Sequence, residues 1–285
     1  MQYGRTSTPE ALPGNDAVKM MQPTTVALNL LRALLALLVV IGPATAMEAQ
    51  CRAPAAFDRL GSPLPHTQRA LDAGGELVIT AIGSSSTAGA GASTADSTYP
   101  AVLARELGHR LAKRSVRVVN RGVNGEEIAN MRMRFDHDIL ESTPRPVLVI
   151  WQLGTNAVLR ESGVAHHLGD IREGVRRLKE AGIDVILMDV QYAPPVLADP
   201  DHTDMNRMIA EIARTEGVGL FRRFDLMRHW SVTGQIPAAA MLAPDQLHLN
   251  DTGYRCIAKH LANAILLAAR PAPLAGSPSK GAAVR

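Results

Sequence analysis

From residue 76 onward, the hydrophobic positions alternate between two spacings. Short apolar runs, typical of buried strands, are separated by segments whose apolar residues recur at helical spacing. The runs expected to form strands are Leu77–Ile82, Val116–Val119, Val147–Leu153, Ile183–Met188 and Val218–Phe221. The segments expected to form helices are Tyr99–Arg114, Glu126–Phe135, Val164–Ala181, Asp204–Glu216 and Asp251–Leu267. This alternation predicts an α/β fold whose parallel sheet is covered by helices on both faces.

Four polar segments lie at the ends of the predicted elements. Three of them follow the first three strands, and the fourth precedes the last helix. The segments are Gly83–Gly89, Asn120–Gly125, Gly154–Ala157 and Asp245–His248. Each alone is explained as well by an ordinary turn or helix cap. Because ligands of parallel sheets bind beyond the carboxyl ends of the strands, the four together favour one shared site.

The residue types in these segments suit nucleophilic acyl transfer. A serine hydroxyl is a weak nucleophile, so a base must take its proton and a third group must orient that base. His248 and Asp245, three residues apart, can supply the base and the orienting carboxylate. A backbone N–H of segment 120–125 and the Asn156 amide are candidates to stabilise an oxyanion. Spacing alone does not choose among the serines of the first segment.

In this order, the four segments resemble the blocks of the SGNH/GDSL hydrolase family. The resemblance covers residues 76–267 and implies a flavodoxin-like three-layer sandwich with a central five-stranded parallel sheet. The catalytic residues that it implies are Ser85, Asp245 and His248, and its oxyanion hole is formed by Ser85, Gly125 and Asn156. The family usually has Asp where this chain has Ser84, and often Asp where it has Ala157. Neither position is the nucleophile or the base in the family.

The resemblance implies a serine esterase that hydrolyses carboxylic esters carrying short acyl or O-acetyl groups. No cofactor is needed for this chemistry, and the substrate would be a small-molecule or polysaccharide ester. An acyltransferase of the same fold and a catalytically silent carbohydrate-binding module are the alternatives. No metal site is expected either, because the adjacent His166 and His167 point apart on a helix.

The segment after the fourth strand is expected to form a wall of the site. Within it, Asp189, Gln191 and Tyr192 are candidates to bind a polar alcohol portion of the substrate, such as a sugar. The alternative is a loop whose polar groups satisfy one another.

Charge and composition exclude one class of partner. The formal net charge is only +3, and basic and acidic residues are interspersed without a long basic run. We therefore expect no nucleic-acid partner.

Residues 1–46 have the features of a signal peptide region. The apolar stretch Ala33–Gly42 is followed by the small residues of an Ala-x-Ala cleavage pattern. It is shorter than the ~20 residues of a membrane span, although an uncleaved anchor or a buried helix is an alternative. Met20 or Met21 would make a more usual start. A periplasmic or secreted protein without a stable membrane span after signal removal is therefore expected.

The rest of the chain divides into three parts. Residues 47–74 are a lead-in segment without a sustained period, residues 75–269 form the hydrolase domain, and residues 270–285 are expected to be a disordered tail. An oxidising compartment would permit a bridge between Cys51 and Cys256, but two independent thiols are equally compatible with the sequence. The oligomeric state is not indicated.

Overall fold

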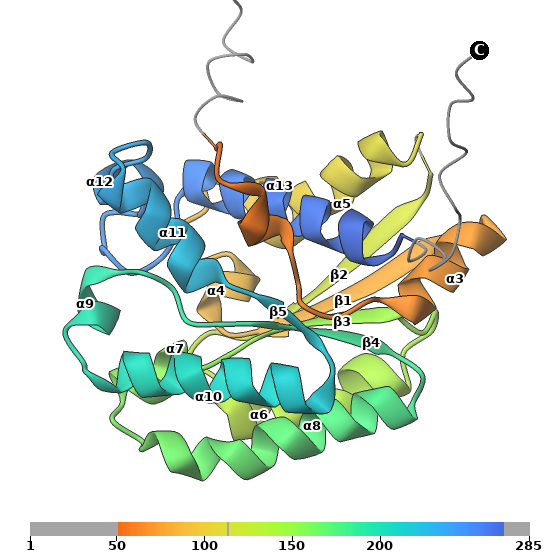
Figure 1. The fold of residues 1–285 in the computed structure, drawn as a ribbon, viewed down its shortest axis with the longest axis horizontal. Helices are drawn as coiled ribbons and strands as arrows, with labels where there is room; N and C mark the ends of the chain where they lie inside the picture. Colours follow the sequence, from red (N-terminus) through yellow and green to blue (C-terminus); the bar gives the residue numbers. More distant parts are fainter. Residues whose placement is uncertain (1–50, 113, 271–285) are drawn as a thin grey trace, which may run out of the picture. The chain divides into compact units, whose positions relative to one another are not determined.

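The computed structural model describes residues 51–112 and 114–270, and a parallel sheet lies at their centre (Figure 1). The strands are β1 (Leu77–Gly83), β2 (Val116–Gly122), β3 (Leu148–Gln152), β4 (Asp184–Met188) and β5 (Gly219–Phe221). Their order in the sheet is β2-β1-β3-β4-β5, with every neighbouring pair parallel. The predicted flavodoxin-like sheet is therefore confirmed. The chain changes direction across the sheet between β1 and β3, where such folds form a binding crevice.

Helices cover both faces of this sheet (Figure 1). The longer helices are α5 (Tyr99–Arg110) and α13 (Asp251–Ala268) on one face, and α6 (Ile128–Met133), α8 (Leu168–Glu180) and α10 (Asp201–Glu216) on the other. The remaining helices are α3 (Pro65–Ala73), α4 (Ser85–Ala88), α7 (Thr155–Leu159), α9 (Pro194–Leu197), α11 (Arg223–Val232) and α12 (Ala238–Met241). Single helical turns lie at Ala55–Asp58, Ala95–Ser97, Asp136–Leu140 and Val164–His167.

Local sequence explains the main element boundaries. Every residue of β1, β3 and β4 is buried, as expected of parallel strands covered on both faces. Helix α13 is capped at its N-terminus by Asn250, whose side-chain oxygen accepts the N–H groups of Thr252 and Gly253. Helix α10 is followed directly by Gly217, which adopts the left-handed conformation that glycine tolerates.

Among the helices longer than five residues, two were not expected from the sequence. Helix α3 lies in the lead-in segment, where Pro and Gly obscure the period, although Pro65 occupies a first-turn position that suits proline. Helix α11 follows β5, and its polar residues include the buried Arg223. The predicted helix at 164–181 divides into a single turn and α8.

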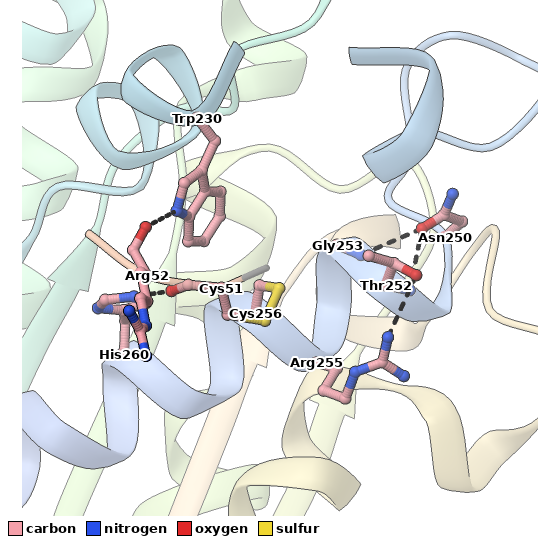
Figure 2. Close-up of a disulfide and its surroundings, with 9 residues drawn as sticks. All are labelled: Cys51, Arg52, Trp230, Asn250, Thr252, Gly253, Arg255, Cys256 and His260. Carbon is pink, nitrogen blue, oxygen red and sulfur yellow. Dashed lines mark hydrogen bonds between the residues drawn. A yellow bond between two sulfur atoms is a disulfide. The ribbon is translucent and has the colours of Figure 1, made fainter. Parts of the chain in front are cut away.

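The lead-in segment is joined covalently to the last helix. Cys51 and Cys256 form a disulfide, so the bridged alternative is the correct one (Figure 2). Leu60 and Leu64 are buried in the common core. The described part of the lead-in segment is therefore packed against the rest of the domain as part of the fold.

Polar contacts reinforce this attachment. His260 on α13 lies with Nε2 2.7 Å from the Cys51 carbonyl oxygen and Nδ1 2.6 Å from Asp58 Oδ1. The indole N–H of Trp230 donates to the Arg52 carbonyl at 2.9 Å (Figure 2). Both contacts hold the backbone at the disulfide, at Cys51 and at the residue that follows it.

The predicted signal peptide, the start site and the tail beyond Arg270 lie outside the described residues. None of the helices in the described ranges combines the length and the apolar character needed to cross a bilayer.

Candidate active site

The turn after β1 places a serine at the carboxyl edge of the sheet. Ser85 is the first residue of α4, and Ser84 precedes it as the extended N-cap. Two glycines let α4 approach the strands closely. A Cβ on Gly83 would lie 2.2 Å from Thr87 Oγ1, and one on Gly122 would lie 2.0 Å from the backbone nitrogen of Ala88. No other residue fits at either position without displacing this turn.

A buried glutamine accepts hydrogen bonds from this turn. Gln152, at the end of β3, accepts hydrogen bonds at Oε1 from the Ser84 N–H at 2.9 Å and the Ser84 hydroxyl at 3.2 Å. The Thr87 hydroxyl donates to the same oxygen at 3.2 Å. Ser84 is 2 % exposed, so its hydroxyl faces the interior and the next serine faces outward.

The side chains of Ser85, His248 and Asp245 are joined by a continuous chain of hydrogen bonds. The Ser85 hydroxyl oxygen is 2.7 Å from His248 Nε2, and His248 Nδ1 is 2.6 Å from Asp245 Oδ2. The carboxylate can only accept, so Nδ1 must carry a proton. In the neutral ring, Nε2 is then free to accept the Ser85 proton. The residues that the sequence placed at opposite ends of the domain are thus brought together.

The Asp245 carboxylate also orders its own loop. Asp245 Oδ1 accepts the backbone N–H groups of Leu247 and His248, both at 3.0 Å. Partial burial raises the pKa of Asp245, but the hydrogen bonds from the His248 ring and from these N–H groups outweigh it and lower the pKa to about 2. Asp245 therefore remains ionised at neutral pH, as an orienting group requires.

The two other candidate oxyanion donors follow two further strands of the sheet. Gly125, after β2, has φ +78°, and Asn156 lies in the first turn of α7 after β3. One Asn156 amide hydrogen is donated to the Glu126 carbonyl at 2.8 Å. This contact brings Asn156 beside the residue that follows Gly125. The amide keeps a second N–H, and the Ser85 N–H begins a helix, where such groups lack an intrahelical acceptor.

The three candidates after β4 have different surroundings. Asp189 is 5 % exposed and accepts the Phe224 N–H at 2.9 Å, while Gln191 is 1 % exposed and bonded at both ends. Tyr192 is half-buried, and its ring packs edge-on against the Phe224 ring at 5.4 Å. The polar groups of Asp189 and Gln191 are therefore engaged inside the protein, as the locally satisfied alternative expected.

Burial also shifts the pKa values of two groups near this loop. Desolvation raises the pKa of Asp189 to about 7, against the opposing effects of the Phe224 N–H and the Arg223 charge. Desolvation lowers the pKa of Arg223 to about 10, while the Asp189 charge opposes it. The Arg223 guanidinium donates to the Asp189 carbonyl at 2.7 and 3.0 Å.

Sequence reasoning did not assign roles to Ser86 and Gln152. Gln152 is the one polar residue in an otherwise apolar strand run, and a buried amide requires partners. That pattern was the available signal. In the part of the chain that the structure describes, no three His, Cys, Asp or Glu side chains are grouped so that they could hold a metal ion.

Comparison with known proteins agrees with this architecture. Residues 50–271 match the Non-GDSL lipase-like family. No curated protein sequence matches the chain. The fold is similar to that of a two-domain esterase (CEX) active on acetylated mannans, with TM-score 0.59 and 20 % identity over 75 % of this chain. The chain spans 58 % of the length of that esterase.

Two single-domain structures are also similar. Axe2, an acetylxylan esterase from Geobacillus stearothermophilus, gives TM-score 0.55 at 22 % identity, covering 67 % of this chain and 95 % of Axe2. TesA gives TM-score 0.56 at 21 % identity, covering 67 % of this chain and 99 % of TesA. The fold is thus similar to that of GDSL-type esterases. The chain belongs to the Non-GDSL lipase-like family.

Proposed function

We propose that this protein is an exported serine esterase that hydrolyses carboxylic esters, with Ser85 as nucleophile, His248 as general base and acid, and Asp245 as the orienting carboxylate. The observation that carries the proposal is the continuous contact from Ser85 Oγ to His248 Nε2 at 2.7 Å and from Nδ1 to Asp245 at 2.6 Å. A base within this range of the hydroxyl proton meets the geometric requirement for general-base catalysis.

In the first half-reaction, Ser85 Oγ forms a bond to the ester carbonyl carbon as its proton passes to His248 Nε2. The tetrahedral intermediate collapses with cleavage of the bond to the alcohol oxygen, which receives the proton from His248. The acyl group is then held on Ser85. Water attacks the acyl-enzyme with His248 again as base, and the carboxylic acid leaves as the Ser85 hydroxyl is restored.

The oxyanion of each tetrahedral intermediate would be held by the N–H groups of Ser85 and Gly125 and by the Asn156 side chain. The contact between Asn156 and the Glu126 carbonyl supports this assignment because it fixes the amide beside Gly125. Removal of one such donor typically costs ~2.7–4 kcal/mol of transition-state stabilisation.

Short acyl groups on a polysaccharide are the proposed substrate class. Two solved structures of similar fold are described as acting on acetylated mannans and as an acetylxylan esterase. The disulfide supports an oxidising compartment, in agreement with the expected signal peptide and a periplasmic or secreted location.

Hydrolysis of p-nitrophenyl acetate, butyrate and octanoate by the purified protein tests the proposal, with Ser85→Ala and Ser84→Ala measured beside it. We expect kcat to fall ~10⁴–10⁶-fold in Ser85→Ala, because nucleophile and base act as one unit. Ser84→Ala should retain kcat within ~10-fold, since it removes only one of the donors to Gln152. Loss of activity in Ser84→Ala alone would contradict the assignment of the nucleophile.

A further inference from the structure

One buried side chain connects the two segments that carry the nucleophile and the base. Gln191 accepts a hydrogen bond at Oε1 from the Ser86 hydroxyl at 2.6 Å. Its Nε2 donates to the Leu247 carbonyl at 2.6 Å. Ser86 directly follows Ser85 and Leu247 directly precedes His248, so the bridge meets both segments one residue from the reacting atoms.

We propose that Gln191 is a positioning residue that holds His248 Nε2 within hydrogen-bond distance of Ser85 Oγ. This inference rests on the proposed esterase function. The nucleophile and the base are 163 positions apart in sequence, so their 2.7 Å contact depends on how two separate segments are placed. A primary amide suits this task because one planar group both accepts and donates.

Burial makes the bridge effective. Gln191 is 1 % exposed, so water does not compete for its two partners, and leaving either one unpaired would be costly. Other contacts between the same regions lie farther along the first segment. The Tyr254 hydroxyl donates to the Ala90 carbonyl at 2.6 Å, and the Ser93 N–H donates to Asp251 at 2.8 Å. These contacts keep the regions together when Gln191 is changed.

Gln152 is a second buried glutamine near Ser85, but its hydrogen bonds reach only one of the two segments. Its Oε1 accepts three donors, and all of them belong to the turn that carries Ser85. Among the described residues, the structure gives Gln152 no hydrogen bond to the His248 loop. Gln152 therefore orients the nucleophile alone, whereas Gln191 sets the relation between nucleophile and base.

The decisive variant is Gln191→Leu, which removes both hydrogen bonds at similar volume. We expect kcat for p-nitrophenyl acetate to fall ~10–100-fold with KM within ~3-fold of wild type, because a displacement of about 1 Å costs rate rather than binding. The rate of Ser85 labelling by a serine-directed phosphonate should fall in parallel.

Thr67→Val is the matched control. Thr67 is fully buried and its hydroxyl donates to Asp184 at the opposite end of β4, at 2.8 Å. This variant also loses a buried hydrogen bond, so its melting temperature should fall while kcat stays within ~2-fold of wild type. A kcat loss equal to that of Gln191→Leu would show a general loss of stability instead of positioning.

Gln191→Glu adds a measurement, the pH dependence of kcat/KM, that would not change if Gln191 were only structural. A neutral carboxyl can accept from the Ser86 hydroxyl and donate to the Leu247 carbonyl, but the ionised carboxylate has no donor for that carbonyl. The kcat/KM of the variant relative to wild type should therefore approach unity at low pH and fall as pH rises. Asp245 and His248 are present in both proteins, so the ratio isolates the introduced carboxyl.

If Gln191→Leu does not fold, the pH-dependent ratio of Gln191→Glu and the smaller kcat loss of Ser86→Ala decide the question. A kcat within ~3-fold of wild type in Gln191→Leu, or a ratio for Gln191→Glu that does not change with pH, would overturn the inference. Wild-type protein that neither hydrolyses esters nor reacts with the phosphonate would instead overturn the proposed function, and the inference with it.

Discussion

Two of the histidine–aspartate pairs among the described residues share one geometry but differ in their third partner. In both pairs, His Nδ1 lies 2.6 Å from a carboxylate oxygen, of Asp245 for His248 and of Asp58 for His260. Beyond the ring, His248 Nε2 faces the Ser85 hydroxyl, whereas His260 Nε2 faces the Cys51 carbonyl. A hydroxyl can donate a hydrogen bond to the ring, whereas a carbonyl can only accept a hydrogen bond.

The third partner therefore decides what each pair can do. His248 can remain neutral and accept the Ser85 proton, as a general base must. His260 faces a carboxylate on one side and a backbone carbonyl on the other, and neither of these can give a proton to the ring. That ring is a clamp between α13 and the lead-in segment, beside the disulfide (Figure 2). A histidine and an aspartate are thus arranged for proton transfer in the His248 pair, and they attach the lead-in segment to α13 in the His260 pair.

The largest expected difference between the pairs comes from one substitution made in each. In Asp245→Asn, an amide N–H would oppose His248 Nδ1–H and favour the wrong tautomer, so we expect kcat to fall ~10³–10⁴-fold. Asp245 is half exposed, with 49 % of its side chain accessible, so the melting temperature should change little. Steady-state kinetics and thermal unfolding of the same preparation check both parts.

Asp58→Asn is the matched change in the second pair. Its carboxylate is bonded to His260 and to the Asn263 amide, so we expect a loss of about 1–3 kcal/mol in the free energy of unfolding. The value of kcat should stay within ~3-fold of wild type. A catalytic defect as large as that of Asp245→Asn would remove the distinction between the pairs.

A second prediction concerns the covalent part of the attachment. Cys51→Ala/Cys256→Ala opens a link between positions 205 apart, which should lower the free energy of unfolding by ~2–5 kcal/mol. Because neither cysteine takes part in the hydrogen bonds that join Ser85, His248 and Asp245, kcat per phosphonate-titrated site should be retained. Chemical denaturation with and without the disulfide measures the first quantity. Unchanged stability would mean that the lead-in is held by its polar and apolar contacts alone.

The smallest expected effect concerns Asp189, a buried carboxylate without a histidine partner. Desolvation raises its pKa from 3.8 to about 7, so between those values the folded protein keeps a proton that the unfolded chain releases. Its contribution to stability is thus full below the lower value and is lost as pH rises toward the higher one.

Asp189→Asn mimics the protonated carboxyl and still offers an oxygen to the Phe224 N–H. The difference in unfolding free energy between variant and wild type should therefore favour the variant more at pH 8 than at pH 5. Urea denaturation at both pH values measures it. An equal difference at the two pH values would contradict the raised pKa.

The sheet was predictable because its strands are buried on both faces and read as short apolar runs. Each of the five expected runs overlaps an observed strand, from β1 to β5. The helices α4 and α7 were not separated from their loops, since one turn of helix is too short to show a period. Helix α3 was missed because proline and glycine around it obscured its apolar spacing.

The candidate site divides in the same way. The short segments nominated His248 and a group of serines, the family resemblance chose Ser85 among them, and the structure brings the Ser85 and His248 side chains together. The bridging role of Gln191 could not be predicted, because its partners are 105 and 56 positions away in sequence. The attachment of His260 to Asp58 spans 202 positions and left no local pattern.

Mapping the site of a serine-directed phosphonate by peptide mass spectrometry tests the central claim most directly. The account predicts one phosphonate per chain, on Ser85, with no adduct in Ser85→Ala and much slower labelling in Asp245→Asn. An adduct on Ser84 or Ser86 instead, or ester hydrolysis by a wild-type protein that the reagent does not modify, would contradict it.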